Sequence, residues 1–331
     1  MFKLRILKGT DALKEIKRLN LKLLCFLLGI MSSLGSVFGS CNPFGVAVSV
    51  VAENEYSFPL IAGSMIGYIF LPKLSRGICY MSIILTVLTF KWLLCGFEKV
   101  RKHILFLPLL CFGLSFLIKI FVNYSTNSDL WYIWKALTEA FMIAVSTYFF
   151  EISFKYFTKS KYPEYDGYKI NHVFISILII ISSLSSATIY NLSVGRILSV
   201  IVIIFAAYCR GIYGGSVVGT AVGAAAGMSS VGMLHISGIY ALGGMFAGFC
   251  TNGSKNGNKS GNKIRAGGAF LVFSTVCLLN SALNLNILVQ LVYETVIGVI
   301  IFSIIPKNIT DYIKLLFGLI EKDEYSEKIK E

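Results

Sequence analysis

The chain has 331 residues, of which 56% are hydrophobic and only 14% are charged, and its mean hydropathy is +0.74. A soluble domain carries about 25% charged residues, whereas apolar runs near the length of a bilayer crossing recur along this sequence. The composition therefore excludes a soluble enzyme, a disulfide scaffold and a nucleic-acid-binding domain. It predicts an all-α, polytopic membrane protein, and the net charge of +13 has to be placed along the chain before it is interpreted.

The chain begins with a basic segment, residues 1–20, which holds six basic and two acidic residues. An apolar run over residues 21–39 follows and predicts a first spanning helix with its N-terminus in the cytoplasm. A cleaved signal peptide is the less favoured alternative. The charged segment is long, and no A-x-A-like cleavage pattern stands near residues 36–40.

Eleven further apolar segments follow. Residues 43–53 and 57–71 are short and are separated by Glu53-Asn54-Glu55, so they form either two thin crossings or one broken helix with a re-entrant half. Counting them separately gives a bundle of up to about 12 spans, and merging the short segments gives about 10. The other segments cover residues 77–96, 104–122, 131–153, 171–190, 194–209, 211–228, 235–250, 265–283 and 286–305.

The positive charge follows the expected topology. Of the net charge of +13, four segments that the longer count places in the cytoplasm hold +12: residues 1–20, 97–103, 154–170 and 251–265. Basic residues concentrate in cytoplasmic loops, so topology accounts for the charge without a nucleic-acid partner. Lys73 and Arg76 would face outside, which is the main defect of this arrangement. Both termini are expected in the cytoplasm.

These patterns divide the chain into a basic N-terminal segment (1–20), a multispanning membrane domain (21–305) and a cytoplasmic tail that starts a linker (306–331). Loop 251–263 is rich in Gly, Asn, Ser and Lys and is typical of a flexible linker. An apolar stripe in the tail predicts a surface helix or the start of a cytoplasmic extension. The stripe consists of Ile313, Leu316, Phe317 and Ile320.

No catalytic or metal-binding constellation is apparent. The eight cysteines never stand in C-x-x-C spacing, and most lie inside apolar runs, where Cys behaves as a small hydrophobe. The histidines, His103, His172 and His235, lie at loops or segment ends without a paired base. We therefore expect no catalytic residue, no metal ligand and no cofactor in this chain.

Glycine recurs at every fourth position over one segment: Gly211, Gly215, Gly219, Gly223 and Gly227. On a helix these residues fall close to one face and permit close contact between backbones. Gly244 and Gly248 repeat the spacing, as do two earlier glycine pairs, Gly35 with Gly39 and Gly63 with Gly67. Tight packing within the chain is the favoured interpretation, and a dimer face or a substrate path is the alternative.

Residues 34–71 and 208–250 are weakly similar. Each stretch has a small-residue segment, a short polar break and a segment that carries G-x-x-x-G. The longer count gives the two stretches opposite orientations, as in the inverted repeats of many transporters. Composition alone also produces such likeness, so an inverted repeat is one of two interpretations.

Charged residues inside apolar segments are costly and point to function. Glu139 has Lys135 one turn earlier, a spacing that allows an ion pair, whereas Glu294 has no sequence-near basic partner. A polar lock is favoured over a transport role for Glu139, and both roles stay open for Glu294. The other intramembrane candidates are Lys91, Lys119 and Arg210, and those near segment ends could extend to the interface.

Several of these pieces together resemble the membrane domain of the stage II sporulation protein E family. The resemblance runs over about residues 20–320 and rests on the order and spacing of a few motifs. They are Pro43-Phe44, Glu139-Ala140, the glycine run from Gly215 to Gly248, Tyr293-Glu294-Thr295 and Pro306-Lys307-Asn308-Ile309-Thr310. The stretch from Tyr293 to Thr310 is the most specific of them.

This resemblance implies more than the composition does. Family members join a multispanning membrane domain to a cytoplasmic linker and a metal-dependent serine phosphatase domain, which activates the forespore sigma factor. They lie at the asymmetric sporulation septum with the division protein FtsZ as a partner. The Mn or Mg ions would belong to the phosphatase domain. We expect no such domain within residues 1–331. Asp166-Gly167 is the one dipeptide of the metal-binding type, and it lies in a short loop.

Two functions follow as hypotheses. The first is a non-catalytic membrane domain that localises a cytoplasmic phosphatase at the septum and supports self-association. The second is a transporter-like or small-molecule-sensing domain that uses Glu139 and Glu294 in a polar cavity.

Overall fold

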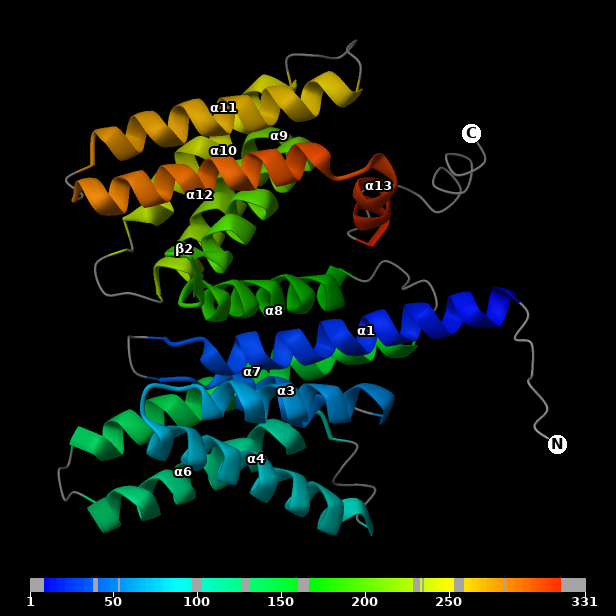
Figure 1. Ribbon diagram of the computed structural model, residues 1–331, viewed down its shortest axis with the longest axis vertical. Coiled ribbons are helices and arrows are strands. Elements are labelled where there is room, and N and C mark those ends of the chain that lie inside the picture. The colour runs from blue at the N-terminus through cyan, green and yellow to red at the C-terminus, as the bar shows by residue number, and fades with distance from the viewer. Residues whose placement is uncertain are drawn as a thin grey trace. The chain divides into compact units, whose positions relative to one another are not determined.

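The computed structural model describes residues 9–37, 41–52, 54–96, 103–126, 131–159, 167–228, 233, 235–252, 259–281 and 284–316. Helices dominate these residues (Figure 1), and the two short strands β1 (Thr188–Ile189) and β2 (Leu192–Ser193) pair antiparallel. The all-α prediction is therefore confirmed. Outside the described residues lie Glu53, Asp166, residues 1–8 of the basic segment, residues 253–258 of the predicted linker, and Phe317 and Ile320 of the tail.

The chain forms two compact units. Unit 1 comprises Met1–Leu34 and Asn42–Glu151, and unit 2 comprises Gly35–Cys41 and Ile152–Glu331. Unit 1 contains α1 (Gly9–Leu34), α2 (Phe44–Val51), η1 (Asn54–Tyr56), α3 (Ser57–Ile69), α4 (Leu74–Leu93), η2 (Leu94–Gly96), α6 (Phe106–Thr126) and most of α7 (Trp131–Lys159). Unit 2 contains α8 (Gly167–Ser185), α9 (Val194–Gly227), α10 (Ile236–Asn252), α11 (Lys259–Leu279), α12 (Leu285–Ile304) and α13 (Lys307–Leu316).

Among the described helices, five are long and apolar enough to cross a bilayer by length and composition: α4, α7, α8, α9 and α12. Four shorter apolar helices accompany them: α1, α3, α6 and α10. Many large apolar side chains on these helices are exposed, among them Phe58, Phe121 and Leu285. Exposed apolar surface on this scale is suited to lipid contact. The number of spans and the side on which the termini lie remain predictions.

Helices α1 and α3 run parallel and almost touch. A Cβ on Gly63 would lie 2.2 Å from the carbonyl oxygen of Phe26, and one on Gly67 would lie 2.7 Å from that of Ile30. The order of these contacts is the same along both helices, so the chain between them must return to its starting end. It does so through α2, whose eight residues are all buried. Helices α2 and α3 are therefore two separate helices that run in opposite directions.

Helix α9 reverses direction at Gly211, where φ is 63° and ψ is −144°. Ile203 before this glycine and Gly215 after it both contact Gly244. Ala207 accepts a hydrogen bond from the hydroxyl of Thr251, 3.3 Å away, whereas Gly219 contacts Tyr240. The arm before Gly211 thus runs parallel to α10 and the arm after it runs antiparallel. The two segments expected over residues 194–209 and 211–228 are these two arms.

Replacing Gly211 with alanine should destabilise unit 2 by about 1–3 kcal/mol, because this backbone region is essentially restricted to glycine. The thermal midpoint of the purified protein in detergent measures the effect. Gly268→Ala is the matched control, since a Cβ built on Gly268 would have no atom within 4 Å beyond its chain neighbours and the backbone of its own helix. Equal midpoints for the two variants would contradict the reversal.

Two predicted boundaries differ from the structure. The first spanning helix was expected over residues 21–39, but α1 ends at Leu34 and a bridge between Val37 and Cys41 follows. Residues 259–263 of the predicted flexible loop are helical and begin α11. Helix formation there is favoured because the apolar run that follows continues the same helix and packs against α10 and α12.

Candidate functional site

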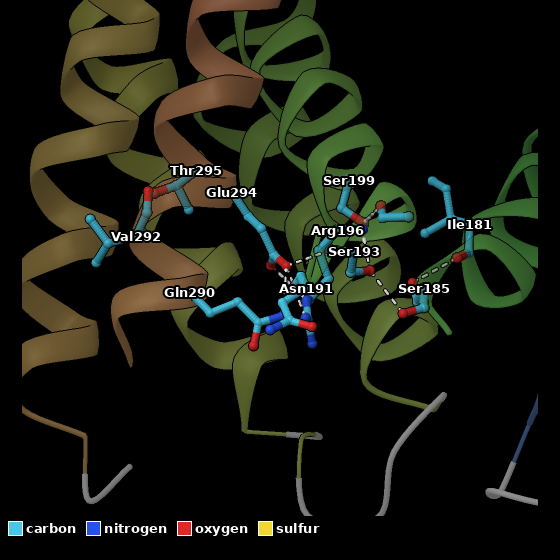
Figure 2. A network of polar contacts seen from close by, with 11 residues as sticks. Ile181, Ser185, Asn191, Ser193, Arg196, Ser199, Gln290, Val292, Glu294 and Thr295 are labelled. Carbon is cyan, nitrogen blue, oxygen red and sulfur yellow. Dashed lines mark hydrogen bonds and ion pairs between the residues drawn. The ribbon is translucent and has the colours of Figure 1, made fainter. Parts of the chain in front are cut away.

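Each unit contains a glutamate that is almost completely buried within the bundle. In unit 2 it is Glu294, which is 0% exposed and lies midway along α12. Its carboxylate is bound by Arg196 in a bidentate manner: Nε donates to Oε2 at 2.6 Å and Nη2 donates to Oε1 at 2.9 Å. Figure 2 shows both side chains pointing toward each other from α12 and the start of α9.

Further donors complete the shell of Glu294. The backbone N–H of Ser193 donates to Oε1 at 2.7 Å, and the amide of Gln290, one turn earlier on α12, donates to the same oxygen at 3.3 Å. The Gln290 amide also bonds the carbonyl of Asn191 in the β1–β2 turn. Four donor groups from α12, α9 and the hairpin therefore surround one carboxylate (Figure 2).

Local structure fixes these donors in place. Tyr190 and Asn191 adopt positive φ in the two-residue turn, which is the geometry that a tight hairpin requires. The Ser193 hydroxyl caps α9 by accepting from the Arg196 N–H at 3.3 Å, and it donates to the Ser185 carbonyl at 2.8 Å. Gly298 lets α12 approach Val200 on α9 closely, so that Glu294 reaches Arg196.

In unit 1 the most deeply buried glutamate among the described residues is Glu139 on α7. It forms an ion pair with Lys119 of α6 and accepts a hydrogen bond from the Tyr80 hydroxyl of α4. The Lys119 ammonium also lies over the Tyr80 ring, 4.4 Å from its centroid. Three helices thus converge on one neutralised charge.

Two tyrosines extend this network to α2. The Tyr80 hydroxyl accepts from the Asn42 N–H at 2.9 Å, and the Tyr68 hydroxyl donates to the Asn42 carbonyl at 2.9 Å and accepts from the Val46 N–H at 3.0 Å. The rings of Tyr68 and Tyr80 stack 4.9 Å apart. At the other end of α2, the Lys91 ammonium donates to the Val50 carbonyl at 3.0 Å, where a cation is favourable at a helix C-terminus. These contacts therefore provide hydrogen-bond partners for backbone groups at both ends of the buried helix α2.

Replacing Tyr80 with phenylalanine should cost about 1–3 kcal/mol, because it removes the partner of a buried carboxylate and of a buried N–H while it keeps the ring under Lys119. Thermal unfolding of the purified chain measures the loss. The control is Tyr213→Phe, since Tyr213 is exposed. A midpoint equal to that of the control would show that the hydroxyl carries no stability.

The structure corrects one expected contact. Lys135 was considered as the partner of Glu139, but the ion pair is made with Lys119. A lysine that precedes a glutamate by four residues has the less favourable order for a helical pair, and α6 brings Lys119 to the buried side of α7. Arg210, also considered inside the membrane, is exposed beside the reversal at Gly211.

The glycine residues lie between α9 and α10. A Cβ on Gly215 would lie 2.0 Å from the Gly244 carbonyl oxygen, and Cβ atoms on Gly219 and Gly223 would meet Tyr240 and Ser237. Gly248 meets Gly211, and Gly227 is buried at the end of the second arm. This stripe is thus occupied within unit 2.

Four residues of these networks were not predicted from the sequence: Arg196, Ser193, Tyr80 and Asn42. Arg196 stands at the start of an apolar segment, and a search for cations matching Glu294 across distant segments could have found it. Tyr80 and Asn42 carry no such signal. No group of three or more His, Cys, Asp or Glu suited to a metal occurs in the part of the chain that the structure describes.

Comparison with known proteins gives one finding. The family model described as SpoIIE, N-terminal domain, matches residues 4–314. No curated protein and no solved structure matches the chain significantly.

Proposed function

Because the chain belongs to the family of SpoIIE N-terminal domains, we propose that it is a non-catalytic membrane domain that anchors a cytoplasmic serine phosphatase at the asymmetric sporulation septum. Through that phosphatase it would act in the pathway that activates the forespore sigma factor. The observation that carries the proposal is the family match, which extends over almost all described helices. The cytoplasmic linker would bind the septal proteins, FtsZ among them. Any Mn or Mg ion would be held by the phosphatase domain.

The two buried glutamates support an anchor over a transporter. A transporter that moves a cation needs a carboxylate that the cation can bind and leave. The carboxylate of Glu294 instead accepts hydrogen bonds from Arg196, Ser193 and Gln290. Glu139 is engaged by Lys119 and Tyr80. Displacing a bidentate arginine from a buried carboxylate is costly, so these groups serve packing better than exchange. The transporter-like or sensing alternative has less support for this reason.

We propose about 10 passes, and up to 12, in the multi-pass bundle, with both termini in the cytoplasm. The longer count includes α2 and both arms of α9 as separate passes, and merging the short ones gives about 10. Within unit 1, the ion pair of Lys22 with Glu55, 3.8 Å apart, supports placing the start of α1 and the start of α3 at one end.

An inverted repeat is part of the proposal. In unit 1, α1 is followed by the returning α2 and the parallel α3, which carries Gly63 and Gly67. In unit 2, the first arm of α9 is followed by the returning second arm and the parallel α10, which carries Gly244 and Gly248. Seven passes precede the first arm of α9 in the longer count, and an odd number gives the two triplets opposite orientations.

Self-association would use faces other than the α9 glycine stripe, because α10 occupies that stripe. A fluorescent fusion of residues 1–331 in sporulating cells tests the proposed function. We expect a band at the polar septum in cells that lack the endogenous protein. An even distribution around the membrane, with the fusion intact, would contradict the proposal.

A further inference from the structure

The three tryptophans of the chain all belong to unit 1, and all of them are exposed. Trp92 stands near the end of α4 and is 75% exposed. Trp131 and Trp134 stand in the first turn of α7 and are 78% and 64% exposed. An indole offers a large apolar surface with one polar N–H, so its exposure here indicates a partner outside the unit.

Contacts among α4, α6 and α7 relate the positions of these tryptophans along the helices. The Lys119 ammonium lies over the Tyr80 ring, and these residues lie 13 residues after the start of α6 and 13 residues before the end of α4. Lys119 also pairs with Glu139, seven residues before the end of α6 and eight after the start of α7. Each connected pair is thus antiparallel, and α4 and α7 run in the same direction (Figure 1).

The tryptophans lie at two levels that are a bilayer thickness apart. The Tyr80 hydroxyl meets the Glu139 carboxylate, so these residues mark one level on α4 and α7. Trp92 lies 12 residues beyond Tyr80 toward one end, which is about 18 Å along a helix. Trp134 and Trp131 lie five and eight residues before Glu139 toward the other end, which is about 8–12 Å. The total of about 26–30 Å matches the hydrocarbon core of a bilayer.

The surface between the two levels is apolar. Among the described residues of α4, α6 and α7 that lie there, no charged residue is exposed. The exposed side chains are apolar, Leu85, Leu117 and Phe141 among them, apart from two threonines. The hydroxyls of Thr89 and Thr138 donate to carbonyl groups of their own helices at 2.8 Å and 3.0 Å, which satisfies them without water. This band is therefore suited to acyl chains.

Charged residues return at the edges of the band. Lys73 is exposed and precedes Tyr80 by seven residues, so it lies about 10 Å from that level, close to the level of Trp131. At the other edge, Lys91 precedes Trp92 and donates to the Val50 carbonyl. Tryptophan beside lysine is typical of the boundary between hydrocarbon and headgroups.

We propose that Trp92 lies in one interface of a phospholipid bilayer, that Trp131 and Trp134 lie in the other, and that together they fix the depth of unit 1. Each ring contacts acyl chains, and each indole N–H donates to oxygen atoms of the headgroup region. The pair of Lys119 and Glu139 then lies about 8–12 Å from one interface rather than at the midplane. This inference goes beyond the anchoring role, because it requires only that unit 1 lies in a bilayer.

Quenching of tryptophan fluorescence by brominated phosphatidylcholine tests the depth of each indole. The full chain is reconstituted in vesicles whose lipids carry bromine either near the glycerol or near the end of the acyl chains. Three variants each retain one tryptophan and have phenylalanine in place of the other two. Each retained indole should lose more fluorescence to the shallow bromines than to the deep ones, and its depth should be about 13–15 Å from the bilayer centre.

Leu85→Trp, in a chain whose three tryptophans are replaced with phenylalanine, is the matched control. Leu85 is 52% exposed on α4 and precedes Trp92 by seven residues, about 10 Å along the helix. The introduced indole should lose more fluorescence to the deep bromines. A preference for shallow bromines in this variant would contradict the depth scale and overturn the proposal.

Stronger quenching of Trp92, Trp131 or Trp134 by the deep bromines would also overturn the proposal. So would the absence of quenching at both bromine depths, and acrylamide in the aqueous phase would then show whether water or a second copy of the chain covers the indole. If a variant with one tryptophan is not monodisperse, the difference between the wild type and Trp92→Phe gives the quenching of Trp92. A larger loss to deep bromines in that difference would equally exclude the interfacial position.

Discussion

Replacing Arg196 with glutamine should destabilise the chain by about 3–5 kcal/mol, because it leaves the carboxylate of Glu294 buried without its cation. Glu294 is 0% exposed, so water cannot take the place of the guanidinium. Thermal unfolding in detergent, followed by size-exclusion chromatography of the intact protein, measures the loss. We expect little folded protein at temperatures where the wild type is stable.

A surface pair provides the control for this prediction. Lys22 and Glu55 lie 3.8 Å apart with side chains that are 41% and 53% exposed, and such pairs contribute about 0–1 kcal/mol. Lys22→Gln should therefore leave the midpoint nearly unchanged. Arg196→Met combined with Glu294→Gln should recover much of the stability, because replacing both members of a buried pair removes the uncompensated charge. A double variant as unstable as the single one would argue against an ion-pair lock.

Replacing Gly215 with alanine should force α9 and α10 apart, with a cost near the upper end of the 1–3 kcal/mol typical of overpacking. The added Cβ would lie 2.0 Å from the carbonyl oxygen of Gly244. Backbone cannot move aside as a flexible side chain can. The thermal midpoint and the yield of monodisperse protein measure the effect.

Gly238→Ala on α10 is the matched control, since its added Cβ would have no atom within 4 Å beyond its chain neighbours and the backbone of its own helix. It should be neutral or slightly stabilising, because alanine favours helix over glycine by about 1 kcal/mol. Equal loss in both variants would mean that helix propensity rather than contact between α9 and α10 is being measured.

How far the sequence predicts this structure differs between segments. Apolar length predicts the helices, and the four-residue glycine spacing predicts a close helix contact. The break at Arg210 divides residues 194–209 from 211–228 in the sequence, but neither signal predicts that both arms pack against α10. The parallel arrangement of α1 and α3 likewise depends on the buried return through α2, whose shortness the sequence showed but whose direction it did not.

The buried charges were predicted as positions but not as pairs. Glu139 and Glu294 stand out because a carboxylate inside an apolar segment is costly. Their partners, Lys119 and Arg196, come from other helices, so local spacing favoured Lys135 and offered no partner for Glu294. Tertiary packing decides such pairs, and no periodic pattern in the sequence predicts which helices pack together.

Septal enrichment of a fluorescent fusion of residues 1–331 tests the central claim most directly, when measured for the wild type and for the neutral double variant Arg196→Met/Glu294→Gln in sporulating cells. The account predicts that both proteins concentrate at the asymmetric septum relative to the lateral membrane, since the ion pair holds the anchor together and takes no part in chemistry. An intact wild-type fusion with equal signal at the septum and along the lateral membrane would contradict it.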